Sequence, residues 1–249
     1  AALGGIERFV KKGADVVIKP NICVAYHGPE YAATTNPQVV AAVVALCLGA
    51  SARRVRVMDA PFGGTAKNAY DRSGIAEAVA AAGGQMEVMN RMRYRDLAIP
   101  DGRKIKKWSV YGDALDADVL INIPIAKDHG STGLTLGMKN LMGLVQDRNS
   151  FHARGLHQCI ADLSSALRPQ LIIVDAVRIL LRNGPTGGSL DDVKRADTVI
   201  AGTDPVAADA YGTTLFGMTG KDIGYIKLAA ELGLGEMDLG KLQVAEVPV

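Results

Sequence analysis

The sequence predicts an α/β fold, with a mostly parallel, open sheet, helices on both of its faces in a Rossmann-like arrangement, and a hairpin-like insertion near 91–117. Two observations lead to this prediction. Short β-branched runs alternate with helical segments at the spacing of right-handed strand–helix–strand crossovers, which place strands parallel. The runs at 118–126 and 170–177 are also apolar almost throughout, as is typical of strands that are covered on both faces.

Each expected strand is a short run that is rich in valine, isoleucine or other apolar residues. Strands are expected at 14–20, 54–61, 85–90, 118–126, 170–177 and 198–202. The insertion at 91–117 is more polar and contains the turn sequence Pro100-Asp101-Gly102, so we expect two antiparallel strands joined by a turn there.

The expected helices carry the residues that helix ends favour. Asn36 suits the N-cap, Pro37 suits the first helical position and Gly49 suits the C-terminal end, so a helix is expected over 35–50. Further helices are expected at 72–84, which opens near Ser73, and at 156–167 and 204–217.

The composition is that of an ordinary globular protein. Of the 249 residues, 48% are hydrophobic and 22% are charged, and the net charge of +2 is too small to indicate nucleic acid as a partner. No segment approaches the roughly 18 consecutive apolar residues of a membrane helix, so no membrane partner is expected.

We predict a single α/β domain over 1–249, with a small subdomain formed by 91–117 and 130–155 as the alternative. The oligomeric state is left open.

The cysteines limit the cofactors that the chain could hold. Cys23, Cys47 and Cys159 are widely spaced and form no C-x-x-C motif. This spacing argues against an iron–sulfur cluster within this chain, against a structural zinc site and against a disulfide framework.

The chain begins without Met, and both a cytoplasmic location and export after removal of a signal fit the sequence.

Polar side chains follow the expected strands, where a parallel sheet places its ligands. The side chains that we expect to contact a ligand are Lys19, Asn21, Asn36, Asp59, Lys127, Asn140, Asp175 and Asp204. Asp59, Asp175 and Asp204 fit equally well as caps of the helices that follow. Lys19 and Lys127 cannot cap a helix N-terminus, so they favour the ligand site.

The segment 123–144 concentrates charge between apolar runs. Lys127, His129 and Lys139 lie within it, and an unpaired charge next to the core would cost several kcal/mol. A carboxylate of the protein or an anionic ligand would each compensate these cations, and we favour a small anionic molecule.

Two kinds of function follow from such a cationic site. The first is an enzyme that acts on a small hydroxy or keto acid, with His129, Lys139 and His152 as catalytic residues, because imidazole exchanges protons near neutral pH. The second is a module that binds an anion or a metal without chemistry. His129, His152 and His157 could together hold a borderline metal such as nickel or zinc. Since His152 and His157 lie five residues apart, His152 would then have to precede the helix.

Several blocks occur in the order found in the family called domain of unknown function 362. The blocks include "VVIKPNI", "INIPIAKDH", "LTLGMKNLMGLV" and "AGTDPVAADAYG", and the resemblance runs from about residue 5 to 217. It implies that some relatives carry an iron–sulfur cluster, which makes an electron-transfer partner a third hypothesis. It also implies that many relatives are exported with a twin-arginine signal.

A shorter stretch is similar to the nickel-pincer lactate racemases. The similarity consists of a histidine, a Gly- and Thr-rich stretch, a lysine ten residues later and a further histidine. It implies that Lys139 would hold a pyridinium-derived cofactor. It also implies that His129 and either His152 or His157 would act as nickel ligand and acid–base pair.

Overall fold

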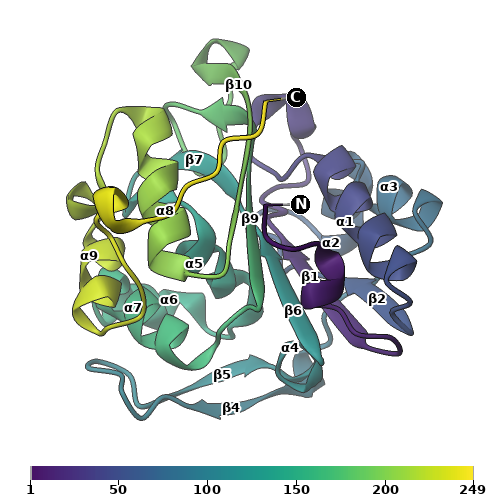
Figure 1. Cartoon of the computed structure of the whole chain (residues 1–249), viewed down its shortest axis with the longest axis horizontal. Coiled ribbons are helices and arrows are strands. Elements are labelled where there is room, and N and C mark those ends of the chain that lie inside the picture. Colours follow the sequence, from purple (N-terminus) through teal and green to yellow (C-terminus); the bar gives the residue numbers. More distant parts are fainter. Residues whose placement is uncertain (1, 249) are drawn as a thin grey trace.

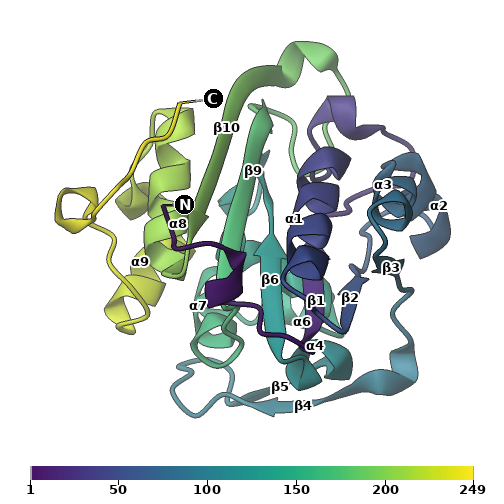
Figure 2. The same ribbon diagram turned by 45° about the vertical axis from the view of Figure 1, so that its right-hand side comes forward.

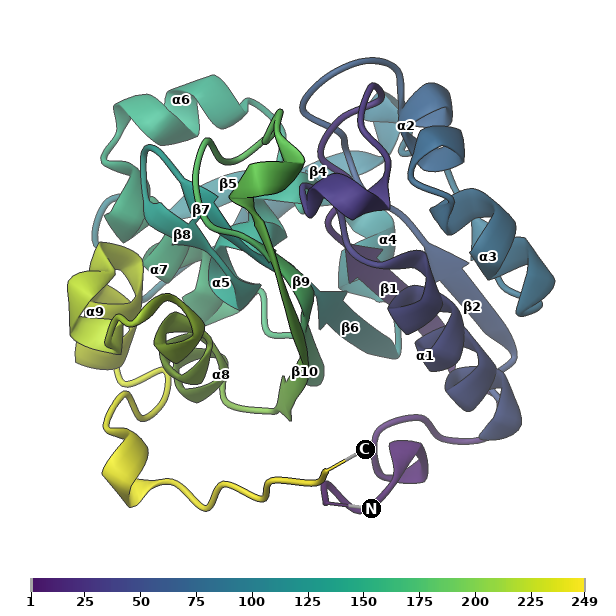
Figure 3. The same ribbon diagram turned by 90° about the horizontal axis from the view of Figure 1, so that it is seen from above.

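The computed structural model describes residues 2–248 and has the predicted α/β architecture. Its main sheet runs in the order β3-β2-β1-β6-β9-β7-β8, with β10 paired to β9. The pairs β1–β2, β2–β3, β1–β6, β6–β9 and β7–β9 are parallel. Helices cover both faces of this sheet, as Figures 1 and 3 show. The predicted fold class is therefore confirmed.

The strands of the main sheet match most of the expected runs. They are β1 (Asp15–Pro20), β2 (Arg54–Val57), β3 (Gln85–Met86), β6 (Val119–Ile123), β7 (Ile125–His129), β8 (Gly133–Thr135), β9 (Leu171–Leu180) and β10 (Val193–Gly202). The run 118–126 is divided at Pro124, which cannot donate a ladder hydrogen bond and instead accepts one from Asp175 N at 2.8 Å. The chain after this proline pairs with a later part of β9 as β7.

The last strand differs from the expectation in its direction. β10 is antiparallel to β9, and its final residue, Gly202, pairs with Ile172 near the start of β9. The carboxyl end of β10 therefore lies at the opposite edge of the sheet from the carboxyl ends of the parallel strands. A long antiparallel strand at this position was not apparent from the run 198–202.

Helices on one side of the sheet come from the first third of the chain. They are α1 (Pro37–Gly49), α2 (Ala66–Arg72) and α3 (Ile75–Ala81). The predicted cap of α1 is confirmed, since the Asn36 side chain accepts a hydrogen bond from Gln38 N at 2.9 Å and Pro37 is the first helical residue. The helix expected over 72–84 is confirmed as α3, which begins after Gly74, whose φ is 71°. The preceding helix, α2, was not expected from the sequence.

The other side is covered by helices from the second half of the chain. They are α5 (Gly137–Asn140), α6 (Arg148–Ala153), α7 (Leu156–Ala166), α8 (Pro205–Thr213) and α9 (Gly224–Glu231), with a 3₁₀ helix, η4 (Leu141–Leu144), after α5. Alternate strand residues enter two separate hydrophobic cores: Val17 and Leu120 pack on this side, and Val16 and Ile18 pack toward α1. No helix formed by residues 2–248 has the length and apolar character needed to cross a membrane.

The insertion near 91–117 is a hairpin, as predicted. It consists of β4 (Tyr94–Ala98) and β5 (Lys107–Tyr111), which pair antiparallel in a second sheet, followed by α4 (Gly112–Asp116). Figures 1 and 2 show it crossing the lower end of the main sheet. Trp108 Nε1 donates to Gln146 O at 2.8 Å, so the hairpin is attached to the segment that leads into α6.

Candidate functional site

A cavity of about 540 Å³ lies where β1, β7, β8 and α5 meet the loops that follow β2 and η4. Eight of the residues that were expected at a site line it: Lys19, Asn21, Asp59, Lys127, His129, Lys139, Asn140 and His152. These side chains come from chain segments up to 133 residues apart, counted from Lys19 to His152. The fold thus assembles them into one hollow.

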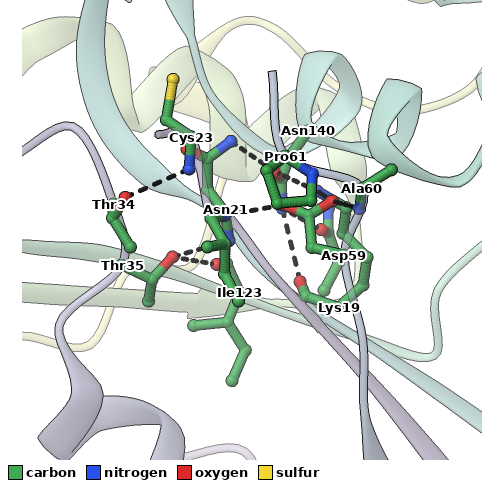
Figure 4. A network of polar contacts seen from close by, with 12 residues as sticks. Lys19, Asn21, Cys23, Thr34, Thr35, Asp59, Ala60, Pro61, Ile123 and Asn140 are labelled. Carbon is green, nitrogen blue, oxygen red and sulfur yellow. Dashed lines mark hydrogen bonds and ion pairs between the residues drawn. The ribbon is translucent and has the colours of Figure 1, made fainter. Parts of the chain in front are cut away.

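One part of the cavity is a network of buried and mutually bonded side chains. Lys19 Nζ lies 3.0 Å from Asp59 Oδ1, and the two side chains are only 1% and 3% exposed. The same Nζ donates to Asn140 Oδ1 at 2.6 Å, and Asn21 Nδ2 donates to that oxygen at 2.9 Å. Figure 4 shows these four side chains together. Burial lowers the pKa of Lys19 to about 8, and the attraction of Asp59 opposes that shift.

The network reaches two further elements, β6 and η4. Asn140 Nδ2 donates to Asn122 Oδ1 at 2.8 Å, which ties α5 to the middle of the sheet. At Gly143, in η4, an added Cβ would collide with Asp59 Oδ1 and lie 2.6 Å from Lys19 Nζ. Glycine is therefore required here because the backbone approaches the ion pair closely, and Gly143 itself lines the cavity.

Lys127 is fully hydrogen-bonded but has no carboxylate partner. Its Nζ donates to Asn21 Oδ1 at 3.0 Å, to Ala33 O at 2.7 Å and to Pro185 O at 2.9 Å. An ammonium group has three hydrogens, so these neutral acceptors satisfy all of them. The positive charge of Lys127 is therefore solvated by dipoles and adds to the field of the cavity.

Lys139 has much weaker partners. It is 8% exposed, and within residues 2–248 its Nζ has one hydrogen-bond contact, 3.5 Å from Met142 Sδ. A thioether sulfur is a poor acceptor for an ammonium group. Burial, followed by repulsion from Lys127 and Arg148, lowers the pKa of Lys139 to about 7. A large fraction of this amine is therefore uncharged at neutral pH.

Thr135 and Arg148 complete this less bonded part of the cavity. Thr135 Oγ1 is buried and has no hydrogen-bond partner among the described residues, although buried hydroxyls are normally bonded. Arg148 donates to Ala60 O at 3.1 Å and to Pro61 O at 3.3 Å, both neutral oxygens. The cavity is lined by four basic residues and two acidic ones. The basic residues are Lys19, Lys127, Lys139 and Arg148, and the acidic residues are Asp59 and Asp147.

Both histidines of the cavity are neutral at physiological pH. Burial, then repulsion from Lys139 and Lys127, lowers the pKa of His129 to about 3. His129 Nδ1 accepts a hydrogen bond from Ser131 N at 3.1 Å, which leaves the proton of the neutral ring on Nε2. His152 lies in the last turn of α6 and is exposed; partial burial and Lys139 lower its pKa as well.

Comparison with known proteins assigns the chain to a family. The model of the family described as "Domain of unknown function (DUF362)" matches residues 16–214. The chain belongs to this family. Among curated proteins, it is 28% identical over 240 residues to the thylakoid-associated protein sll1697 of Synechocystis, covering 93% of this chain and 72% of that protein.

Two solved structures with a similar fold are more distant in sequence. The lactate racemase apoprotein of Thermoanaerobacterium thermosaccharolyticum has 15% identity and a TM-score of 0.47, over 82% of this chain and 49% of its own. A protein of Thermotoga maritima has 13% identity and a TM-score of 0.46, over 89% of this chain and 55% of its own. The chain thus spans about half the length of each. Likeness at this level is no evidence of a shared activity.

Three of the residues that were expected to bind a ligand lie outside the cavity. Asn36 caps α1, and its N–H donates to Asp175 Oδ2 at 2.7 Å. Asp175 is in the middle of β9, which continues to Leu180, and its carboxylate also accepts from Val177 N at 3.0 Å. Asn36 and Asp175 are therefore not among the residues that line the cavity, and backbone N–H groups already use their oxygens. A ligand role for these two residues stays a prediction.

Asp204 is a helix cap at the other edge of the sheet. Its Oδ1 accepts hydrogen bonds from Val206 N at 2.8 Å and Ala207 N at 2.9 Å, at the start of α8. It lines a separate hollow of about 260 Å³. The prediction that placed Asp204 with the other residues is wrong, since it assumed that β10 runs parallel to its neighbours. Of the two interpretations of this aspartate, capping is correct.

His157 also lies away from the cavity. Its ring stacks on Tyr225, with ring centres 6.2 Å apart and planes 19° apart, where α7 packs against α9. The three histidines predicted as metal ligands therefore do not converge. No group of three His, Cys, Asp or Glu side chains that could hold a metal occurs within residues 2–248. Nickel or zinc held by fewer protein ligands stays a prediction.

Sequence reasoning missed several residues that line the cavity. Arg148 directly follows Asp147, whose side chain caps α6 by accepting from Ser150 N at 3.3 Å; that Asp-x-x-Ser spacing was a usable signal. Thr135 gave no signal, because a threonine in a Gly- and Thr-rich stretch is unremarkable. Pro185 lies in the Gly-rich loop between β9 and β10 and gave no signal of a site either.

Proposed function

We propose that this cavity binds a small molecule that carries a carboxylate, of the hydroxy-acid or keto-acid class, and that His129 and His152 transfer protons on it. The main support is the positive charge of the cavity. Lys127, Lys139 and Arg148 line it and have only neutral partners among the described residues. A carboxylate bound between Lys139 and Arg148 would compensate two of these charges and form charge-assisted hydrogen bonds.

The size of the cavity supports an organic ligand. A volume of about 540 Å³ lies within the roughly 300–1,000 Å³ of typical small-molecule sites, and one inorganic ion would fill little of it. The buried hydroxyl of Thr135 offers a donor and an acceptor for a second polar group of the ligand. A hydroxy or keto acid carries its second oxygen next to the carboxylate, which suits this arrangement.

The histidines support proton transfer. Neutral imidazole accepts a proton, and the repulsion that now lowers the pKa of His129 comes from Lys139 and Lys127 after burial. An anion bound beside these lysines would weaken that repulsion and raise the pKa of His129 toward the range in which it is an effective base. Substrate binding would thereby activate the histidine.

Binding is tested by calorimetric titration with lactate, pyruvate and oxalate. We expect at least one of these acids to bind the wild type, and the variant Arg148→Met to bind it about tenfold or more weakly, since a charge-assisted hydrogen bond contributes roughly 1.5–3 kcal/mol. Arg168→Met is the matched control, because Arg168 is exposed and lies outside this cavity. Equal affinity of the wild type and Arg148→Met would contradict the proposal.

Proton transfer is tested by NMR in heavy water with lactate and with pyruvate, both of which have a C–H hydrogen that can exchange. We expect deuterium to replace the hydrogen on the carbon next to the carboxyl or carbonyl carbon in the wild type but not in His129→Ala. Unchanged thermal unfolding of His129→Ala would show that the fold is intact. Binding without exchange in the wild type would favour the alternative of a module that holds the anion without chemistry.

A further inference from the structure

We infer that Lys139 is a nucleophile that forms an imine with the carbonyl group of an α-keto acid bound in this cavity. The inference rests on the proposed function, because the keto acid is one of the two ligand classes named there. It assigns a covalent role to one amine and selects the keto acids as substrates.

The first argument is the contrast between Lys139 and the other lysines of the cavity. Lys19 is held by Asp59 at 3.0 Å and by Asn140 at 2.6 Å, and Lys127 donates all three hydrogens to oxygen. The Lys127 nitrogen gives all its hydrogens to oxygen partners, and the attraction of Asp59 favours the charged form of Lys19, so both amines are held by the protein itself. Lys139 has only the Met142 sulfur at 3.5 Å within the described chain, so its nitrogen is free to attack a ligand.

The second argument is the protonation state of that amine. Lys139 is buried, with 8% of the residue exposed, and its neighbours include the basic residues Lys127 and Arg148. Burial and like charge both disfavour the ammonium form, and they lower the pKa of Lys139 to about 7. A desolvated lysine next to other cations is the usual form of an imine-forming amine, because the free base is present at neutral pH.

The third argument is the set of groups around this amine. Arg148 offers N–H groups for the carboxylate of the keto acid, which would hold the carbonyl carbon in the same cavity as Lys139. Thr135 Oγ1 is a buried hydroxyl with no partner of its own among residues 2–248. It can donate to the carbonyl oxygen and stabilise the negative charge that develops there during attack.

The chemistry balances without any redox partner. The Lys139 nitrogen bonds to the carbonyl carbon, the π electrons of the C=O bond move to oxygen, and one amine proton is transferred to that oxygen. The resulting carbinolamine loses its hydroxyl group, which takes the second amine proton and leaves as water. The products are the imine and one molecule of water.

The test is reductive trapping at pH 7.5 with sodium cyanoborohydride and either pyruvate or the longer 2-oxoglutarate, followed by peptide mass mapping. We expect the peptide that contains Lys139 to gain the mass of the keto acid less one oxygen atom. The rate should exceed that at Lys67 at least about tenfold, because Lys67 is an exposed amine that pairs with Asp71. Lactate, which has no carbonyl to react, should slow the trapping in the wild type.

Two variants separate the outcomes. Lys139→Arg keeps a long basic side chain but removes the nucleophilic amine, and it should show no adduct at this site. Lys67→Arg should be trapped at Lys139 like the wild type. The inference is overturned if Lys139 is trapped no faster than Lys67. It is also overturned if lactate does not slow the trapping at Lys139. If pyruvate binds in the calorimetric titration but is not trapped, the inference fails and the proposed function stands. If lactate, pyruvate and oxalate all fail to bind and no adduct forms at Lys139, both fail.

Discussion

The two walls of the cavity use the same kinds of residue in opposite ways. We call Lys19, Asn21, Asp59 and Asn140 the paired wall, and Thr135, Lys139 and Arg148 the unpaired wall. In the paired wall each polar group is bonded to another side chain, and the Lys19 ammonium is 3.0 Å from a carboxylate. In the unpaired wall the Thr135 hydroxyl has no partner in the described chain, and the Lys139 amine has only a sulfur.

The difference separates stability from function. Buried charges that are paired and hydrogen-bonded hold their surroundings in one arrangement, whereas unpaired ones cost free energy of folding. We therefore interpret the paired wall as the part that shapes the cavity and the unpaired wall as the part that meets the ligand. Each of the following predictions would sharpen or break this distinction.

The largest effect is expected from Asp59→Asn in the paired wall. The substitution keeps the shape of the side chain but leaves the buried Lys19 ammonium without a carboxylate. Breaking a buried ion pair by removal of one partner typically costs about 3–5 kcal/mol. We expect a loss of that order in the free energy of unfolding, measured by urea denaturation.

Asp71→Asn is the matched control for this prediction. Asp71 pairs with Lys67 at 2.7 Å, and these two side chains are 54% and 80% exposed. Exposed pairs contribute at most about 1 kcal/mol, so the control should be nearly as stable as the wild type. Similar losses in Asp59→Asn and Asp71→Asn would show that the Lys19–Asp59 pair has no special role.

A smaller effect, of opposite sign, is expected from Lys139→Met in the unpaired wall. The pKa of Lys139 is about 7 in the folded protein and near 10.5 when unfolded, so the folded state is disfavoured as the pH falls from 10.5 to 7. Methionine removes this cost. At pH 7 we expect Lys139→Met to be more stable than the wild type by at most about 4 kcal/mol, with the difference shrinking to less than half of that at pH 9.5.

Urea denaturation at several pH values between 7 and 9.5 measures this difference. Lys67→Met is the control, because an exposed lysine is charged in both states over this range and its replacement should have no pH-dependent effect. A wild type that is more stable than Lys139→Met at pH 7 would mean that Lys139 has a stabilising partner after all, and would remove it from the unpaired wall.

The assembly of the cavity could be predicted from sequence to a large extent. Lys19, Lys127 and His129 lie at the ends of apolar runs, and parallel strands bring such ends to one edge of a sheet. Lys139 follows within ten residues of His129, so its position nearby is also constrained by the chain. The pattern of hydrophobic residues and the rule for parallel strands were sufficient for these residues.

The partners of each side chain could not be predicted. Sequence alone left Asp59 and Asp175 equivalent, but Asp59 lies beside Lys19, whereas the Asp175 carboxylate accepts N–H groups from the start of α1. Asp204 was misplaced because nothing in the run 198–202 indicates the direction of its strand. The pairing of side chains and the direction of strands depend on long-range packing. The distinction between the two walls rests on that pairing, so it could not be predicted from the sequence either.

The smallest effect concerns the affinity of the unpaired wall for an anion. The amine of Lys139 loses its proton as the pH rises through about 7, and with it the attraction for a carboxylate. Lactate is the suitable probe because it has no carbonyl to form an imine. Its affinity for the wild type should fall between pH 6 and 8, by at most about tenfold per pH unit, since one proton is involved. In Lys139→Met the affinity should be lower at pH 6 and nearly independent of pH in this range. If the affinity of the wild type is also independent of pH, the bound carboxylate does not contact Lys139, and Arg148 alone must hold it.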